Sequence, residues 1–392
     1  MRVCIVTQEC PGVTEYYGGI GTQYAAFAPE WAAAGVDTHF VTMKLRGRQA
    51  PDMLDGVHIH ALGSGYFFPW HAAEWARKVN RAIAETGPYD AIISPEFRGE
   101  CSVYARRQDH GPLVTHLLTS SQQLLSLRPG LTFLERRGLR TRVFLHAERT
   151  QAENSRELYA PSTAVLDWAR ELWPATAGLT SRVLPLAIRV EQVRRQAAAG
   201  ELPGGFPAPS DTPIVGLASR LDGHKGAADL VAAMRDVWRT HSDAHLVMIG
   251  RDARYGHGMM SDHLRAAAGG HADRLHITGA LPSSQYFAAV AACDVIAVPS
   301  LWESFCLAAV EAMALGRPVV ATSGHGFDEY LRDGENGLLV PRSDIPALAD
   351  ALVRLLTDTE LRASLGAAAA ATAEDLDVSR VAGRYLAGFA EL

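Results

Sequence analysis

The sequence predicts an α/β protein made of two doubly wound parallel-sheet (Rossmann-like) domains. Apolar segments of strand length alternate with helical segments in the first half of the chain, and this alternation restarts in the second half. Between the halves, residues 191–212 are enriched in Ala, Gly and Pro, which is typical of a linker. A length of 392 residues suits two domains of ordinary size. We therefore expect domains at residues 1–190 and 213–375 and a final helix at about residues 379–392.

Short apolar runs mark the strands, and longer amphipathic runs mark the helices between them. In the first half, strands are expected at residues 2–7, 36–43, 56–62, 88–94, 112–118, 157–162 and 182–187. In the second half they are expected at residues 214–217, 245–249, 275–278, 295–298 and 318–322. Helices are expected, among other places, at residues 70–86, 141–155, 164–172, 226–238, 283–291 and 305–315.

Composition excludes several classes of protein. Hydrophobic residues make up 48% of the chain and charged residues 20%, as in a globular protein in water. A net charge of −6 argues against nucleic acid or an anionic membrane as a partner. No run approaches the roughly 18 apolar residues of a membrane span, and the N-terminus reads as a buried strand without a signal peptide. We therefore expect a cytoplasmic protein, and the sequence leaves its oligomeric state open.

The cysteines and two histidines indicate neither disulfides nor a metal site. The five cysteines are scattered without a Cys-x-x-Cys pair: Cys4, Cys10, Cys101, Cys293 and Cys306. His58 and His60 share one face of an expected strand, but no further His, Cys or acid cluster surrounds them in the sequence. We interpret them as a hydrogen-bonded pair and expect no metal.

The most informative stretch is residues 299–322. It reads as a turn after a buried strand, a helix that Gly316 ends, and a second buried strand. Glu303 precedes the helix, next to amides of Phe305, Cys306 and Leu307, and Glu311 lies about two turns along it. Two carboxylates beside helix-end amides suit a polyol such as ribose or a hexose. The alternative is two solvated charges.

Two further turns follow the first strand of each half. In the second half, Arg220 and Lys225 flank a turn that leads into a helix, an arrangement that suits a diphosphate leaving group. A solvated basic turn is the alternative. In the first half, Gly18 and Gly19 open a glycine loop that predicts a phosphate cradle. Tyr24 stands where the dinucleotide fingerprint has its third glycine, and a simple tight turn remains possible.

These motifs resemble those of the family 4 (GT4) glycosyltransferases, which have the GT-B fold. The resemblance covers most of the second half of the chain. It rests on Pro-Ser before the paired glutamates, the Arg220 to Lys225 element, and three glycine-containing segments at residues 278–281, 324–329 and 333–340. Ser304 and Cys306 stand where many members have glycine, which leaves the donor hexose open.

The resemblance implies a retaining transferase that uses a nucleotide-diphosphate sugar, with UDP expected, and needs no metal or other cofactor. The first domain would bind the acceptor and the second the donor, and the final helix would cross back to the first domain. Glu303 would contact the donor hexose, Glu311 the ribose, and Arg220 and Lys225 the diphosphate. Two sets complete the expected donor site: the base-binding residues Ala280 and Leu281, and the loop glycines Gly18 and Gly19.

His116 lies near the carboxyl end of an expected strand, where similar enzymes have a histidine that orients a donor hydroxyl. We therefore count it among the catalytic candidates, with a hydrogen-bonded core histidine as the alternative.

The acceptor is inferred from acidic residues of the first half. Four glutamates fall just beyond expected strand ends: Glu9, Glu15, Glu96 and Glu100. Acidic side chains there favour a cationic acceptor, such as an amino sugar or aminocyclitol of antibiotic biosynthesis, and ordinary loop charges are the alternative. Two other functions stay open: a nucleotide-sugar epimerase and a non-catalytic sugar-nucleotide binding protein.

Overall fold

A computed structural model describes the chain except residues 15–17, 45–48, 64–70, 128–137, 209–211 and 257. Contacts divide the chain into two compact units. Unit 1 contains Met1–Ala187 and Val378–Leu392, and unit 2 contains Ile188–Asp377. Each unit is an α/β layer structure, which confirms the predicted fold class.

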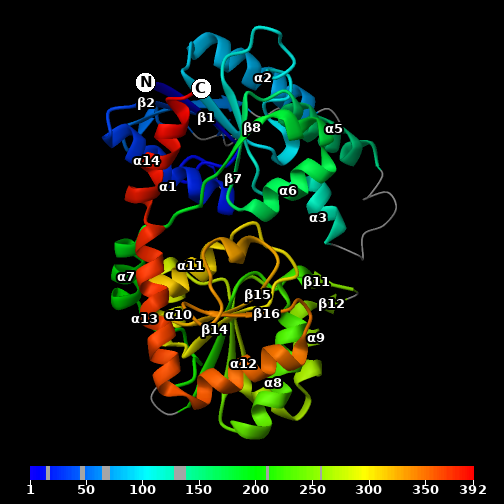
Figure 1. The fold of residues 1–392 in the computed structure, drawn as a ribbon, viewed down its shortest axis with the longest axis vertical. Coiled ribbons are helices and arrows are strands. Elements are labelled where there is room, and N and C mark those ends of the chain that lie inside the picture. Colours follow the sequence, from blue (N-terminus) through cyan, green and yellow to red (C-terminus); the bar gives the residue numbers. More distant parts are fainter. Residues whose placement is uncertain (15–17, 45–48, 64–70, 128–137, 209–211, 257) are drawn as a thin grey trace. The chain divides into compact units, whose positions relative to one another are not determined.

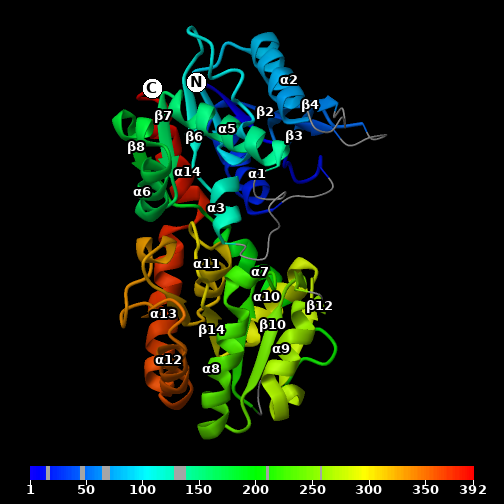
Figure 2. The same ribbon diagram turned by 90° about the vertical axis from the view of Figure 1, so that its right-hand side faces the viewer.

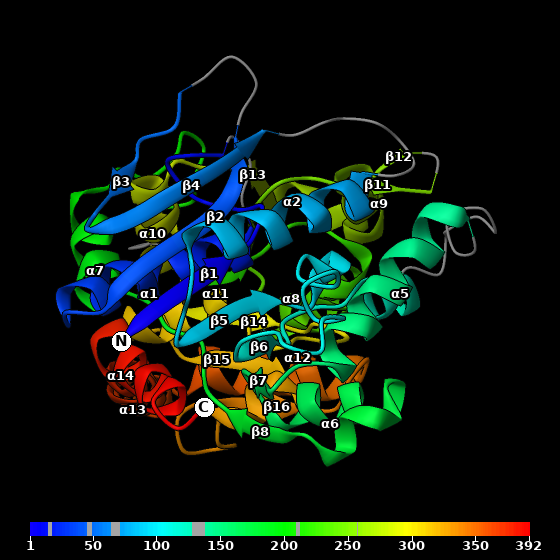
Figure 3. The same cartoon turned by 90° about the horizontal axis from the view of Figure 1, so that it is seen from above.

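Unit 1 is built on an eight-stranded sheet, whose strand order can be followed in Figure 3. Every strand pairs in parallel except β3, which pairs antiparallel with β4. From one edge to the other the strands are β3 (Met53–Leu54), β4 (Val57–Gly63), β2 (Asp37–Lys44), β1 (Arg2–Val6), β5 (Ala91–Pro95), β6 (Leu113–His116), β7 (Glu157–Ala160) and β8 (Thr180–Val183). Winding reverses between β1 and β5, which makes the carboxyl ends of these two strands the switch point of unit 1.

Helices cover both faces of this sheet, because its central strands are apolar on both sides. Among the described residues, the helices of unit 1 are α1 (Gly19–Ala33), α2 (His71–Thr86), α3 (Ser121–Ser126), α5 (Leu139–Glu153), α6 (Thr163–Leu172) and α14 (Val378–Phe389), with 3₁₀ turns η1 (Phe97–Gly99) and η2 (Pro174–Gly178). On one face α14 packs against α1, where Trp31 donates a hydrogen bond to the Ala382 carbonyl at 3.2 Å. The last helix of the chain is therefore part of unit 1.

Unit 2 is built on a six-stranded parallel sheet. Its order is β13 (Leu275–Gly279), β10 (His245–Ile249), β9 (Ile214–Ala218), β14 (Val295–Val298), β15 (Val319–Thr322) and β16 (Leu338–Val340). A two-stranded ribbon of β11 (Arg254–Tyr255) and β12 (Gly258–Met259) lies outside this sheet. Winding reverses between β9 and β14, which defines the switch point of unit 2.

Two helical layers enclose the sheet of unit 2. One contains α12 (Ile345–Thr357), α8 (Ala227–Thr240) and α9 (Met260–Ala268), which follow one another in Figure 2. The other contains α7 (Val190–Ala199), α10 (Ser283–Ala292), α11 (Leu307–Ala314) and α13 (Thr359–Asp375), which Figure 1 shows on the opposite side of the sheet. Three 3₁₀ turns complete unit 2: η3 (Gly223–Lys225), η4 (Gly269–Arg274) and η5 (Gly326–Glu329).

The start of the expected linker at residues 191–212 is helical instead. Helix α7 occupies it and packs against α10 and α11, with Val190 and Val193 buried. The Ala-rich composition that suggested a linker also favours a helix, and the two apolar side chains decide between them because they are buried in unit 2.

Within the described residues, no helix is long and apolar enough to cross a membrane.

Candidate functional site

The loops after β9 and β14 come together at the switch point of unit 2. Gly226 lies between η3 and α8 with a positive φ of 71°. A Cβ atom on Gly226 would collide with the carbonyl oxygen of Pro299, which follows β14. Glycine is required here for both its backbone conformation and its close approach to the neighbouring loop. The contact brings Lys225 on the first loop close to Glu303 on the second.

Lys225 and Glu303 form a largely buried ion pair. Their Nζ and Oε1 atoms are 2.6 Å apart, with side chains 18% and 9% exposed. Ser300 donates a second hydrogen bond to the same oxygen, at 2.8 Å. Burial by itself would lower the pKa of Lys225 and raise that of Glu303, but their attraction outweighs burial. The pKa of Lys225 is raised and that of Glu303 lowered, so both groups are charged at neutral pH.

A buried histidine braces the backbone of Glu303. The Glu303 amide donates to Nδ1 of His325 at 3.2 Å, and Nε2 of His325 lies 2.9 Å from the Thr322 hydroxyl. That hydroxyl in turn donates to the Ser300 carbonyl at 2.5 Å. Because Nδ1 accepts, the proton of the neutral ring is on Nε2. Burial lowers the pKa of His325, which favours this neutral form.

Glu311 lies on α11 and is held by a tyrosine of the neighbouring helix. The Tyr286 hydroxyl on α10 donates to Oε2 of Glu311 at 2.7 Å. Burial raises the pKa of Glu311 to about 7, and the bond from Tyr286 only partly opposes this effect. The helix that carries Glu311 is shorter than the predicted helix at residues 305–315, because α11 begins at Leu307 and ends at Ala314.

The residue before α11 has an unusual backbone conformation. Cys306 has a φ of 75°, in the left-handed region that glycine adopts more easily. Its neighbour Phe305 is fully buried, and the Tyr330 hydroxyl donates to the Phe305 carbonyl at 2.7 Å. The loop is thus held in one shape by Tyr330 and the bonds around Glu303, which lets it keep a strained residue at the helix start.

The other predicted donor residues lie at the carboxyl ends of the same sheet. Arg220 follows β9, and its guanidinium pairs with Asp222 at 2.8 Å while its side chain stays 49% exposed. Ala280 and Leu281 follow β13 and are exposed and partly exposed respectively. Unit 2 therefore presents Arg220 and Lys225 on the loop after β9, Glu303 on the loop after β14, and Glu311 within the helix that follows this second loop.

In unit 1, the glycine loop predicted to hold a phosphate is occupied by a side chain of the protein. The Glu9 carboxylate accepts from the amides of Gly18 at 2.7 Å and Gly21 at 3.0 Å. An anion at the start of α1 is what the amides and the helix dipole favour, and Glu9 supplies it. In this arrangement Glu9 occupies amides that were predicted to bind a phosphate, and the ligand-binding roles of Gly18, Gly19 and Glu9 stay predictions.

The predicted acceptor ligands Glu96 and Glu100 are buried as well. Both oxygens of Glu96 accept from the Leu118 amide, at 2.9 and 2.8 Å. Glu100 accepts from the Gln8 amide and the Trp75 indole, each at 3.2 Å. Because burial raises the pKa of each carboxyl to about 8, they are largely uncharged at neutral pH. Their proposed role as exposed anions was wrong, and Glu15 lies outside the described residues.

His116, which was predicted as a catalytic group, lies in the core of unit 1. It is fully buried at the end of β6, and both ring nitrogens are engaged. Nδ1 lies 3.1 Å from the Tyr24 hydroxyl and Nε2 lies 3.2 Å from the Tyr385 hydroxyl. Burial lowers the pKa of His116 to about 3, which keeps the ring neutral. The alternative reading, a hydrogen-bonded core histidine, describes this geometry.

Sequence reasoning missed the residues that hold the two donor glutamates. Ser300, His325 and Tyr286 contact Glu303 or Glu311. His325 and Tyr286 do not stand at a spacing from their partners that would indicate these contacts. Ser300 had the clearest signal, because it follows a buried strand and precedes Glu303 by three residues. His325 lies in the glycine-containing segment at residues 324–329.

Comparisons with known proteins show the family and the fold of this chain. Residues 201–372 match the family model for glycosyl transferases group 1. A phosphatidyl-myo-inositol mannosyltransferase from Mycobacterium tuberculosis is 34% identical over 317 residues, which are 79% of this chain and 75% of that protein. A 2-deoxystreptamine N-acetyl-D-glucosaminyltransferase from Streptomyces fradiae is 30% identical over 268 residues, 66% of this chain and 62% of that protein. The structure of sucrose-phosphate synthase from Thermosynechococcus elongatus has the same fold, with a TM-score of 0.78 at 22% identity, covering 100% of this chain and 98% of that one.

Proposed function

This chain belongs to the group 1 glycosyltransferases, and we propose that it moves a hexose or amino-hexose from UDP to a cyclitol acceptor that carries amino groups. The observation that carries the donor part of this proposal is the Lys225–Glu303 ion pair at the switch point of unit 2. Open α/β sheets bind ligands at such points. An ion pair at this place supplies a cation for a diphosphate and a carboxylate for sugar hydroxyls.

Each donor residue then has a distinct role. Lys225 uses one of its three N–H groups for Glu303, so two remain for the diphosphate, and Arg220 adds a second cation. These cations stabilise the charge that develops on the leaving nucleotide without any proton transfer. Glu303 accepts from Lys225 and Ser300 through Oε1, so Oε2 is the oxygen that would accept a hexose hydroxyl.

Glu311 would accept a hydroxyl of the ribose through the oxygen that Tyr286 leaves open. Tyr286 donates to Oε2, so Oε1 is the oxygen that would accept the ribose hydroxyl. Departure of the nucleotide and attack of the acceptor on the same face would retain the anomeric configuration. Unit 2 would bind the donor in this scheme, and unit 1 the acceptor.

The acceptor is proposed from the names of the relatives, because the acidic residues of unit 1 are bonded within the protein and do not indicate a cationic acceptor. One relative is named for 2-deoxystreptamine, an aminocyclitol, and another for phosphatidyl-myo-inositol, which contains a cyclitol without amino groups. A cyclitol ring is common to both names. We take the aminocyclitol as the proposed acceptor, of the kind that aminoglycoside antibiotic assembly uses.

The donor is tested by titrating UDP-, GDP- and ADP-sugars and measuring the melting temperature and turnover. We expect UDP-sugars to give the largest shift, and Glu311→Ala to weaken donor binding by at least about tenfold. Glu360→Ala, an exposed glutamate on α13, is the matched control and should bind like the wild type. Unchanged binding and turnover in Glu311→Ala would show that the ribose assignment is wrong.

The acceptor is tested by mass spectrometry of products formed from 2-deoxystreptamine and from myo-inositol 1-phosphate. Preference for the phosphate would overturn the aminocyclitol proposal. A control without acceptor separates the other functions: release of an epimerised sugar nucleotide would indicate an epimerase. Binding without transfer to either acceptor and without hydrolysis would indicate a non-catalytic protein.

A further inference from the structure

Three histidines and an aspartate gather on neighbouring strands of unit 1, whereas the loops of the proposed donor site belong to unit 2. Asp37 and His39 are two residues apart on β2, and His58 and His60 are two residues apart on β4. In the parallel pairing of these strands, His39 lies opposite His58 and Val41 lies opposite His60. Side chains two residues apart on a strand share a face, so all four polar side chains lie on one face of the sheet.

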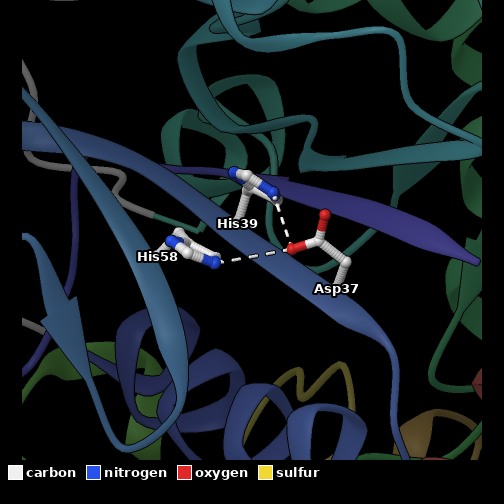
Figure 4. A group of neighbouring side chains, drawn as sticks. All are labelled: Asp37, His39 and His58. Atoms are coloured by element: carbon white, nitrogen blue, oxygen red, sulfur yellow. Dashed lines mark hydrogen bonds and ion pairs between the residues drawn. The ribbon is translucent and has the colours of Figure 1, made fainter.

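Two of the histidines converge on one oxygen of the aspartate. Nε2 of His39 lies 3.0 Å from Oδ1 of Asp37, and Nε2 of His58 lies 3.6 Å from the same oxygen. Figure 4 shows both rings turned toward this carboxylate. The three candidate ligand atoms all lie within 4.8 Å of one another, and the described residues contain no other such group of His, Cys, Asp or Glu.

These separations suit a late first-row divalent metal ion. With metal–ligand bonds of about 2.0–2.1 Å in a tetrahedral arrangement, two ligand atoms are about 3.3 Å apart. The two measured separations, 3.0 and 3.6 Å, lie on either side of this value. Imidazole nitrogens with one carboxylate oxygen are a donor set that Zn²⁺ accepts, and three protein ligands leave a fourth position for water.

His60 provides the outer hydrogen bond that metal-binding histidines normally have. Nδ1 of His39 lies 2.8 Å from Nε2 of His60, and the two rings are nearly parallel. If Nδ1 of His39 carries the proton and donates it to His60, the lone pair on Nε2 is free to bind a metal.

We propose that Asp37, His39 and His58 form a binding site for Zn²⁺ or a similar divalent ion, with His60 as a positioning residue for His39. The ion would join β2 to β4 through side chains of both strands and so stabilise this edge of the sheet. The site is independent of the transfer reaction, for which no metal is expected. The side chains of Asp37 and His58 are 47% and 44% exposed, which gives an ion a route from solvent.

Arg2 is the competitor of the metal ion. Its Nε lies 3.0 Å from Oδ2 of Asp37 and 3.1 Å from Nε2 of His39, so a guanidinium now supplies the positive charge. The Arg2 side chain is 34% exposed and would have to turn outward when an ion binds. Removing this charge in Arg2→Gln should therefore tighten metal binding severalfold.

The test is a calorimetric titration of tag-free protein with ZnCl₂ alone, in a buffer that does not chelate metals. We expect one ion per chain and a higher melting temperature in its presence. His60→Ala should weaken binding by about tenfold, and His58→Ala and Asp37→Asn should weaken it further because each removes a ligand. His58 and Asp37 are exposed enough that both variants are expected to fold.

The matched control is a second histidine pair on the sheet of unit 2. Nδ1 of His245 and Nε2 of His276 are 2.7 Å apart on β10 and β13, but they do not belong to a group of three ligand atoms. His245→Ala should leave zinc binding unchanged. No saturable binding below about 100 μM zinc, or equal binding in the wild type and His58→Ala, would overturn the proposal, as would loss of binding in His245→Ala instead.

Discussion

The switch points of the two units use glutamate in opposite ways. In unit 2, Glu303 follows β14 and faces Lys225, a fixed cation 2.6 Å away. In unit 1, Glu96 and Glu100 follow β5, and the bonds that they accept come from neutral N–H groups of Leu118, Gln8 and Trp75. All three carboxyls are buried, with less than a tenth of their surface exposed.

The comparison teaches that burial does not by itself decide the charge of a carboxyl. Lys225 outweighs burial and lowers the pKa of Glu303, whereas burial dominates at Glu96 and Glu100 and raises their pKa to about 8. A buried carboxylate beside a cation is available for electrostatic work, while a buried carboxyl that meets only amides serves to hold a loop. The acids of unit 1 therefore belong to its framework.

The largest expected effect is a loss of activity that occurs when the glutamate of unit 2 is changed and not when that of unit 1 is changed. Glu303→Gln should lower kcat/KM by about 10²–10³, because it removes the carboxylate that meets the donor sugar and leaves Lys225 without its counter-charge. Glu96→Gln keeps an acceptor for the Leu118 amide, so steady-state kinetics should stay close to wild type. Equal losses in both variants would break the comparison.

Stability gives the next test. Lys225→Met should cost about 3 kcal/mol at pH 7, because it leaves Glu303 buried and uncompensated. The pKa of Glu303 is lowered from 4.5 in the folded protein, so this loss should be present above pH 4.5 and shrink as the pH falls below it. Urea unfolding of the single variants and of Lys225→Met with Glu303→Gln measures the coupling. A double variant no more stable than Lys225→Met would contradict the pairing.

His116 tests whether polar groups of unit 1 are structural. His116→Leu should cost about 2 kcal/mol, because the Tyr24 and Tyr385 hydroxyls lose their shared partner in the core. Turnover per folded molecule should be unchanged, which is measured by comparing kcat with the folded fraction from circular dichroism. A large fall in kcat with unchanged stability would restore His116 as a catalytic residue.

The last expected effect is a slope of stability with pH in unit 1, which is small over a single pH unit. The pKa of Glu96 rises from 4.5 to about 8 on folding, so the folded state holds a proton that the unfolded chain has released. Stability should therefore fall as pH rises between about 4.5 and 8, by on the order of 1 kcal/mol per pH unit. Glu96→Gln mimics the protonated acid and should reduce this slope in chemical denaturation at several pH values, while Glu100, whose pKa is also raised to about 8, keeps its own contribution. A slope of the same size in the variant would assign the effect to other groups.

Much of the fold could be predicted because it depends on local patterns. Apolar runs such as β1 and β14 are buried on both faces, and this requires continuous apolar sequence whatever their partners are. Lys225 and Glu303 were also identified individually, because each follows a strand in a turn of recognisable composition. The local pattern was less decisive at α7, because an Ala-rich stretch suits either a linker or a helix. The burial of Val190 and Val193 in unit 2 favours the helix.

The sequence alone determined the strand and helix alternation, the residues of the donor loops and the family resemblance. Only the tertiary structure decided which charges meet. Lys225 and Glu303 are 78 residues apart and pair because β9 and β14 are neighbours in the sheet. In unit 1, the pairing of β2 with β4 brings His39 beside His58. Glu96 and His116, at the ends of β5 and β6, are buried in the same unit. Charge, pKa and accessibility depend on neighbours in space, and the order of strands across a sheet sets those neighbours.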